Sequence, residues 1–489
     1  MAHPRSSEPL VGAIRWDAWF EGNARPGLVD PSLYDDYSYR EPVYGWFETA
    51  VPHQDEIIDQ QIQYAVDGLL DFWAFVWYPD ERDRPGMPPL NGALKSYMRS
   101  KLHHALQFCL ILQTGWVAGK IDGHASQWRS TFVPEFIALI RDEQYVKVEG
   151  NRPLVFWMDT ENLDDPAKEG FGPLWQDELY FFAAACIEAG FGKPYLVDMR
   201  HDYKSAAKYG FDGVSDYGPA SLRTPGHFGF DKLMQHDRNK MEANHDLKVL
   251  PGISAAIDPR PRHNEAWTKA VGASYYGFSY ELPTFSEWTS HLRETFDWLA
   301  QHPDRTCDPP IVAIYSWNEL DEGGAGIVPT RQEGTLFLDG IRAAKTGDLP
   351  LWIEDRINDS NPYIDYSGDW KREFPVQGAY CNDFTWSDRA GDSFEFSFTG
   401  EAVALIGYRG PEEGILAIEI DGKPVASVDL WQDRLSAGEV WIKLEGLSHD
   451  RHRLKVVIVE REGSMPATLR CALDCLIVYQ LGDRLIPQI

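Results

Sequence analysis

Residues 313–327 read AIYSWNELDEGGAGI and join a predicted strand to a cluster of acidic side chains. The apolar run 311–315 predicts a buried β-strand. After it come an aromatic residue, an amide and three carboxylates: Trp317, Asn318, Glu319, Asp321 and Glu322. Packing alone does not explain these residues, because acidic side chains are rarely buried unless they are paired. They either cap the next helix or, as we favour, form a functional site at the carboxyl end of a parallel strand.

Apolar runs that alternate with helical patterns precede this strand. The runs cover residues 11–19, 70–78, 108–116, 153–159, 194–198, 213–217 and 248–254, and the helical patterns cover 54–69, 94–106, 133–142, 174–189, 201–209, 230–245 and 285–301. Continuous apolar runs predict strands that are buried on both faces. Together with 311–316 they predict a (β/α)8 TIM barrel over residues 1–348. A doubly wound open sheet is the alternative, which we disfavour because no glycine-rich nucleotide loop follows an early strand.

The pattern changes after residue 349. Short, mostly alternating segments cover residues 393–398, 403–407, 416–420, 425–430, 439–444, 454–459 and 473–479. Glycine turns separate them, and Asp421-Gly422 between two such segments is typical of a β-hairpin. The pattern predicts an antiparallel β-sandwich over 381–489, joined to the barrel by a polar connector over 349–380. This sandwich resembles the galactose-binding-like, carbohydrate-associated modules.

Composition limits the partners. The chain has 75 Asp and Glu against 46 Lys and Arg, a net charge of −29 that disfavours nucleic acid and anionic membrane surfaces. Its six cysteines are scattered and predict neither a disulfide framework nor a zinc site, so we expect no cofactor and no bound metal. No apolar run approaches the length of a membrane span, and residues 1–13 lack the apolar region of a signal peptide. We therefore expect a cytoplasmic protein.

In a barrel, the site is assembled from side chains at the carboxyl ends of the strands. Besides the cluster after residue 316, the candidates are carboxylates, aromatics and one histidine: Asp17, Glu48, Trp77, Tyr78, Asp122, His124, Asp159, Asp216, Tyr217 and Asp258. Carboxylates hydrogen-bond sugar hydroxyls, and aromatic rings cover the apolar faces of sugars, so this set favours a glycan as the partner. Any single aspartate could instead be a turn residue or a helix cap, and His124 could be structural.

A basic cluster follows the run at 248–254. Arg260, Arg262 and His263 lie within four residues of one another. They are either a solvated charge cluster or a binding site for a uronate or a sulfate.

Glu319 and Glu322 are the most informative pair of acidic residues. If the chain turns helical after the strand, residues three apart place their side chains on one face, about 5–6 Å apart at Cβ. Glycoside cleavage needs one acid to protonate the leaving oxygen and a second group to assist at the sugar. Two neighbouring carboxylates can divide these two roles.

The stretch WNELDEG at residues 317–323 resembles the WNEWxEG motif of the family 99 endo-α-mannosidases and of the related WbsX-type proteins, often labelled glycosyltransferases. The stretches FWAFVWYP at 72–79 and LPGISAAIDPRPR at 250–262 are also similar to that group. The sequence departs from the family at Leu320-Asp321, where the family has an aromatic and a histidine, and at Val328-Pro329, where the mannosidases have Glu-Pro.

The resemblance implies a role for each motif residue. Glu319 would act as base on the substrate's own 2-hydroxyl, which attacks the anomeric carbon to form a 1,2-anhydro sugar. Glu322 would be the acid and then the base, and Trp317 and Asn318 would position the substrate. The implied activity is a retaining glycoside hydrolase for an α-linked glycan.

Three alternatives stay open. A glycosyltransferase is implied by the WbsX label, but the sequence has no phosphate loop. A non-catalytic glycan-binding protein would use the same aromatics and carboxylates for binding alone. A polysaccharide lyase would act on a uronide.

Overall fold

Eight parallel strands form the barrel, as the sequence predicts. They are β1 (Leu10–Arg15), β2 (Phe72–Val76), β3 (Gln107–Gln113), β5 (Arg152–Met158), β6 (Tyr195–Asp198), β7 (Gly213–Val214), the two parts β9 (Lys248–Val249) and β10 (Gly252–Ser254), and β12 (Ile311–Tyr315). The computed structural model describes residues 8–20, 32–78, 90–118, 127–168, 170–218, 224–243, 246–262, 278–322, 326–460 and 469–485. Every residue of β2 and β12 is buried, because side chains fill the barrel interior and helices cover its outside.

The sheet closes on itself through one interrupted strand. Its strand order is β10-β12-β1-β2-β3-β5-β6-β7-β9, and β9 and β10 at its two ends are separated only by Leu250 and Pro251. Leu250 N–H donates to Val214 O on β7 at 2.9 Å, and Pro251 O accepts from Ala313 N–H on β12 at 2.9 Å. Gly252 permits close passage of β10, because a Cβ there would lie 2.6 Å from Asp216 N. The TIM-barrel prediction is confirmed.

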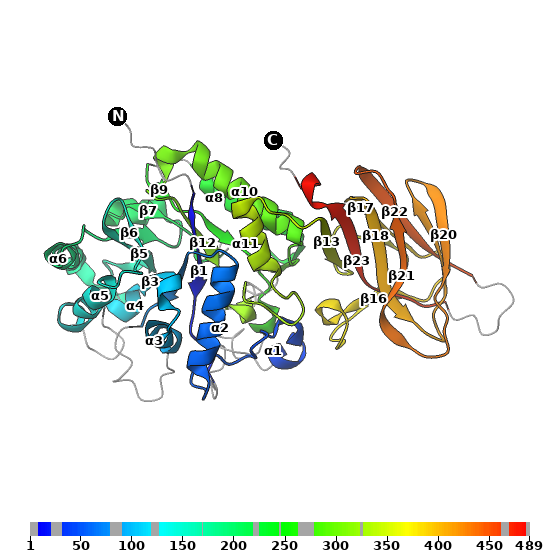
Figure 1. The fold of residues 1–489 in the computed structure, drawn as a ribbon, viewed down its shortest axis with the longest axis horizontal. Helices are drawn as coiled ribbons and strands as arrows, with labels where there is room; N and C mark the ends of the chain where they lie inside the picture. The colour runs from blue at the N-terminus through cyan, green and yellow to red at the C-terminus, as the bar shows by residue number, and fades with distance from the viewer. Residues whose placement is uncertain are drawn as a thin grey trace.

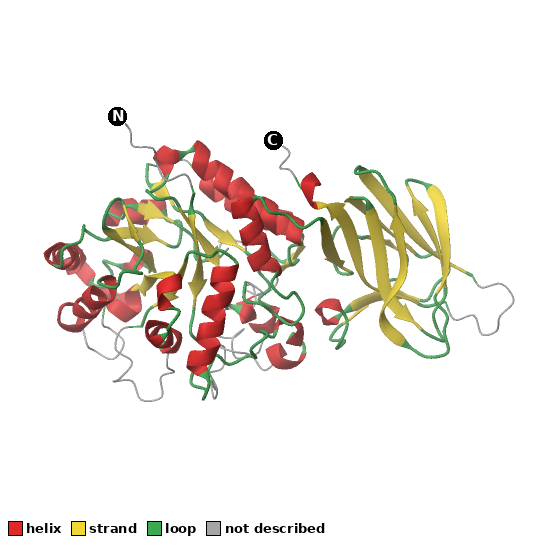
Figure 2. Ribbon diagram, viewed as in Figure 1, coloured by secondary structure: helices red, strands yellow, loops and turns green. Residues whose placement is uncertain are grey.

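Helices surround this sheet (Figures 1 and 2). The larger ones are α2 (Gln54–Asp67), α3 (Gly92–Arg99), α5 (Val133–Ile140), α6 (Trp175–Glu188), α7 (Tyr203–Tyr209), α8 (Phe230–Met241), α10 (Phe285–Gln301) and α11 (Leu336–Thr346). Helix α10 begins with a capping box, in which Glu287 N–H donates to Thr284 Oγ1 at 3.2 Å and Thr284 N–H donates to Glu287 Oε2 at 2.9 Å. Within the described ranges, no helix combines the length and the apolar character needed to cross a membrane.

A second, smaller sheet lies apart from the barrel sheet. It pairs β8 (Gly226–Phe228) with β11 (Phe278–Tyr280) in parallel. These strands follow β7 and β10 in the chain, and they lead into α8 and α10. Three-residue strands carry too little periodicity to be predicted from sequence.

The carboxyl-terminal part is an antiparallel β-sandwich, as predicted. Its strands are β13 (Trp352–Asn358), β14 (Asp365–Ser367), β15 (Lys371–Glu373), β16 (Phe384–Ser387), β17 (Ser393–Thr399), β18 (Ala402–Arg409), β19 (Ile415–Ile420), β20 (Lys423–Asp429), β21 (Ser436–Glu445), β22 (Arg451–Val459) and β23 (Cys471–Leu481). One sheet has the order β15-β16-β23-β18-β21, with β13 also paired to β23, and the other has the order β14-β17-β22-β19-β20. Buried side chains such as Phe394, Leu416 and Leu454 fill the space between the sheets.

The range 349–380, predicted as a connector, contains strands β13, β14 and β15. Strand β13 pairs with β23 along seven residues, so the sandwich begins near residue 352 rather than at 381. Two of its three exposed positions, Glu354 and Arg356, carry charge, which made the strand resemble a polar linker. Its buried Asp355 instead accepts hydrogen bonds from Ser286 N–H at 3.0 Å and from Gln480 Nε2 at 2.8 Å. The strand is therefore tied directly to the barrel helix α10.

Candidate active site

The segment that follows β12 stays hydrogen-bonded to neighbouring residues of the barrel before it turns. Trp317 N–H donates to Ile14 O on β1 at 2.7 Å, and Ile327 N–H donates to Ser316 O at 2.9 Å. Residues Leu320–Glu322 form one 3₁₀ turn, in which Glu322 N–H donates to Glu319 O at 3.2 Å. Side chains three residues apart eclipse one another in such a turn. Glu319 immediately precedes this turn and Glu322 ends it, so the two residues lie three positions apart at one turn.

Each of these two carboxylates is held by a tyrosine. Glu319, which is 3% exposed, accepts a hydrogen bond at Oε1 from the Tyr217 hydroxyl at 2.6 Å. Glu322 is half-buried and accepts from the Tyr315 hydroxyl at Oε2. The two tyrosine rings pack 5.3 Å apart. Burial, followed by the charge of Glu319, raises the pKa of Tyr217 well above its ordinary value, so this hydroxyl stays a donor.

Hydrogen bonds made by the side chains of Asn318 and Trp317 hold the turn in place. Asn318 Oδ1 accepts from Trp16 N–H at 3.0 Å, and its Nδ2 donates to Trp16 O at 2.8 Å and to Glu48 Oε1 at 2.5 Å. The Trp317 indole N–H donates to Gln61 Oε1 at 2.9 Å. Both side chains are buried, so they fix the position of the neighbouring Glu319.

Glu48 and Asp17 lie in a buried network rather than at the open end of the site. Glu48 Oε2 accepts from Arg15 Nη2 at 3.1 Å and from Gln61 Nε2 at 2.6 Å. The Arg15 guanidinium is fully buried, 4.5 Å from the centre of the Trp73 ring. The network therefore braces the ends of β1 and β12 from within the core.

Asp17 has a structural role at the start of α3. Its Oδ2 accepts from the N–H groups of Ala93 and Leu94 at 2.9 and 3.3 Å, and its Oδ1 accepts from Arg15 Nε at 3.3 Å. Burial raises the pKa of Asp17 to about 7, although Arg15 and the two N–H groups act in the opposite direction. Asp17 is therefore a helix cap, which is one of the interpretations considered for the aspartates at strand ends.

The other described aspartates are also engaged by cations. Asp159 accepts from Arg200 Nη2 at 2.5 Å and from Gln113 Nε2 at 3.0 Å. Asp216 is ion-paired with Lys240 of α8. These contacts tie neighbouring strand ends together and leave fewer carboxylate oxygens for a ligand.

Asp258 is paired with two arginines. It accepts from Arg260 Nε at 2.6 Å and from Arg260 Nη2 at 2.8 Å, and it is also ion-paired with Arg40. Burial acts to raise the pKa of Asp258, but the two guanidiniums together hold it well below its ordinary value. Arg260 is therefore committed to a buried carboxylate, which differs from both the solvated cluster and the uronate site considered from the sequence.

The predicted aromatic residues lie at the end of β2. Trp77 is 4% and Tyr78 is 6% exposed. The Tyr78 hydroxyl accepts from the Trp16 indole N–H at 2.7 Å, and its ring packs edge-on against Trp116, 4.7 Å away. Burial and, in smaller part, the charge of Glu319 raise the pKa of Tyr78.

Some predicted residues lie outside the described residues, and other residues were missed. Asp122, His124 and His263 belong to the first group. Tyr315 was missed because it ends an apolar run and was read as core, although a hydroxyl at the last position of a strand was a signal. Arg15 was missed because no local pattern marks a buried cation.

Among the described residues, no group of three or more His, Cys, Asp or Glu is arranged to hold a metal ion.

No protein-family model matches this sequence, and a search of the curated proteins finds no match. Among solved structures, the GH99 endo-α-mannosidase from Bacteroides thetaiotaomicron is 13% identical, with a TM-score of 0.39 over 69% of this chain and 96% of that chain. A structure described as a glycoside hydrolase-like protein is 13% identical, with a TM-score of 0.42 over 71% and 97%. The carbohydrate-binding module CBM36, in complex with calcium and xylotriose, is 12% identical, with a TM-score of 0.19 over 26% and 98%.

Proposed function

We propose that the protein is a glycoside hydrolase that cleaves an α-linked glycan or oligosaccharide. The observation that carries this proposal is the placement of Glu319 and Glu322 on one turn at the carboxyl end of β12, each hydrogen-bonded by a tyrosine hydroxyl. Two carboxylates at one point of a barrel mouth meet the requirement of glycoside cleavage for an acid and a second assisting group. The resemblance of residues 317–323 to the WNEWxEG motif supports the same assignment.

The proposed reaction has two steps and retains the anomeric configuration. In the first step, Glu319 takes the proton of the substrate's 2-hydroxyl, whose oxygen attacks the anomeric carbon. The glycosidic bond breaks as Glu322 gives its proton to the leaving oxygen, which leaves a 1,2-anhydro sugar. In the second step, Glu322 takes a proton from water and the water oxygen bonds to the anomeric carbon, while the bond between that carbon and the 2-oxygen breaks and Glu319 returns its proton to the 2-oxygen.

The remaining residues divide into binding and bracing groups in this proposal. Tyr217 and Tyr315 orient the two carboxylates through their hydroxyls. Tyr78 is kept as a proposed substrate-binding residue, although its ring is only 6% exposed. Glu48 and Asp17 act through the protein, since their oxygens accept hydrogen bonds from buried protein donors.

A panel of α-linked oligosaccharides, assayed for released reducing ends, tests the proposal. We expect turnover by the wild-type protein and a loss of about a thousandfold in kcat for Glu322→Gln and for Glu319→Gln. Glu56→Gln is the matched control, because its side chain is 79% exposed on α2 and should leave kcat unchanged. Wild-type turnover by Glu322→Gln would refute its role.

The product distinguishes the mechanism from its alternatives. Proton NMR of the first product anomer should report retention, whereas inversion would exclude participation of the 2-hydroxyl. Turnover that requires a nucleotide-activated sugar donor would instead indicate a glycosyltransferase. Absorbance from an unsaturated uronide would indicate a lyase.

A further inference from the structure

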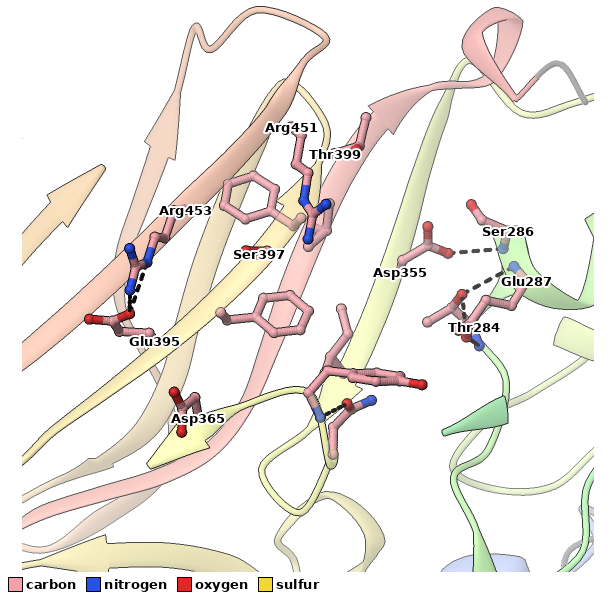
Figure 3. A pocket seen from close by; sticks show the side chains of 16 residues that line it. Thr284, Ser286, Glu287, Asp355, Asp365, Glu395, Ser397, Thr399, Arg451 and Arg453 are labelled. Carbon is pink, nitrogen blue, oxygen red and sulfur yellow. Dashed lines mark hydrogen bonds and ion pairs between the residues drawn. The ribbon is translucent and has the colours of Figure 1, made fainter. Parts of the chain in front are cut away.

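A cavity of about 540 Å³ lies between the barrel and the sandwich (Figure 3). The first turn of α10 forms one wall, through Thr284, Ser286 and Glu287, and strands β13, β17 and β22 form the other side. This volume is within the range of small-molecule sites. None of its lining residues belongs to the candidate active site described above.

The two walls of this crevice are bound to each other. Asp355 of β13 accepts from Ser286 N–H of α10 at 3.0 Å. Tyr363 lines the cavity from the sandwich side, and its hydroxyl donates to Asp231 Oδ1 of α8 at 2.6 Å. The Tyr363 N–H donates to Asn361 Oδ1 at 2.9 Å. The ring is 52% exposed yet held at both ends, so it is a preorganised aromatic surface.

Several polar groups of the crevice are not used by the protein itself. In Figure 3 no hydrogen bond or ion pair joins Arg451, Asp365, Ser397 or Thr399 to another residue drawn, whereas Arg453 is bound to Glu395. Strand β17 turns Ser397 and Thr399 outward, and Thr399 lies directly opposite Arg451 in the ladder with β22. Within the described part of the chain, the side chains of these four residues form no hydrogen bond or ion pair.

The charge and polarity of the walls select the class of ligand. Four carboxylates and two guanidiniums line the cavity, which disfavours a phosphate or a uronate. Burial raises the pKa of Glu287 to about 7 and also raises that of Asp355, so the site is not built for a strong cation either. Phe396 and Phe398 are turned into the sandwich core, at 8% and 6% exposure, so an apolar ligand would find little surface.

An uncharged molecule that is rich in hydroxyls and has one flat apolar face matches these walls. We propose that the crevice binds a neutral oligosaccharide, with Tyr363 under a sugar ring and Arg451, Ser397 and Thr399 hydrogen-bonded to its hydroxyls. Helix α8 lies between barrel strands β7 and β9, and helix α10 lies between β10 and β12, so their first turns face the end of the barrel that carries Glu319. The inference goes beyond the proposed function, because binding in the crevice requires no catalysis.

Affinity gel electrophoresis of the full chain tests this proposal. The probes are soluble neutral polysaccharides (yeast mannan, xylan and dextran), with polygalacturonate and chitosan as charged comparisons. We expect at least one neutral polymer to retard the protein, and Tyr363→Ala and Arg451→Ala each to weaken that binding by about tenfold. Tyr363→Phe keeps the ring but loses the hydrogen bond to Asp231, so it should bind more tightly than Tyr363→Ala. Arg434→Ala removes an exposed arginine of the sandwich outside the crevice and should retain binding.

Two kinds of result would overturn the proposal. Neutral-polymer binding that survives both Tyr363→Ala and Arg451→Ala places the glycan elsewhere, for example at the barrel mouth, and overturns the proposal. Retardation by the charged polymers alone, or by none of the probes, also overturns it. Hydrolysis is measured separately, so a protein that cleaves glycans without crevice binding, or binds without cleaving, is recognised as such.

Discussion

Replacing Glu48 by glutamine tests whether the buried network under the motif supports the active site. The carboxylate accepts from Arg15 Nη2 at 3.1 Å, Gln61 Nε2 at 2.6 Å and Asn318 Nδ2 at 2.5 Å. A glutamine has one acceptor oxygen, so in either orientation its NH2 group faces at least one of these donors. It also removes a negative charge beside Arg15, whose ion pair with Asp17 at 3.3 Å remains.

The expected cost of Glu48→Gln follows from burial. Glu48 is 1% and Arg15 is 0% exposed, and breaking a buried ion pair costs about 3–5 kcal/mol. Asp55→Asn is the matched control, because its partner Arg99 lies 2.6 Å away in a pair that is more than half exposed. Such a surface pair contributes about 0–1 kcal/mol.

Differential scanning calorimetry measures both variants, since a chain with two domains need not unfold in one step. We expect the barrel transition to move down markedly in Glu48→Gln and hardly at all in Asp55→Asn. We also expect kcat on an active glycan to fall by about tenfold or more, because the change disturbs one of the three hydrogen bonds that fix Asn318 beside Glu319. A Glu48→Gln protein as stable as the Asp55→Asn control would refute the bracing role.

Three further substitutions test single interactions. Tyr217→Phe removes the 2.6 Å hydrogen bond to Glu319 and should lower kcat by about tenfold or more in the same assay; unchanged kcat contradicts the orienting role. Burial raises the pKa of Glu413 from 4.5 to about 8, so folding stability falls as pH rises through that interval. In calorimetry, Glu413→Gln should therefore stabilise the sandwich more at pH 8 than at pH 5, by at least about 1 kcal/mol. Asp258 has a lowered pKa, so its stabilisation is present above about pH 4 and lost in acid; Asp258→Asn should destabilise the protein at neutral pH and flatten its acid unfolding curve.

The strands were predictable because burial leaves a periodic record in the sequence. The barrel strands lie within the continuous apolar runs predicted for them or differ by a residue or so at the ends, and the alternating runs of the sandwich became β17 to β23. Strand β13 escaped prediction, since its exposed charges hid the alternation and its buried Asp355 is satisfied by partners far away in the chain.

The placement of Glu319 and Glu322 on one turn was also predictable, because it depends only on local spacing. The two tyrosines that hydrogen-bond these glutamates differ in their distance from them along the sequence. Tyr217, a predicted site residue, lies 102 positions from Glu319, and no local pattern could pair the two. Tyr315 lies seven positions from Glu322, but its hydroxyl was read as part of a core strand.

What the sequence determined by itself was the set of strands and helices, the barrel class and the acidic turn, since each depends on the periodicity of short segments. Only the tertiary structure decided which polar groups meet. Glu48 lies 33 positions from Arg15 and 270 from Asn318, and the crevice joins the start of α10 to strands of the sandwich. Hydrogen bonds and ion pairs between distant residues obey three-dimensional distance alone, so they leave no spacing for a sequence to display.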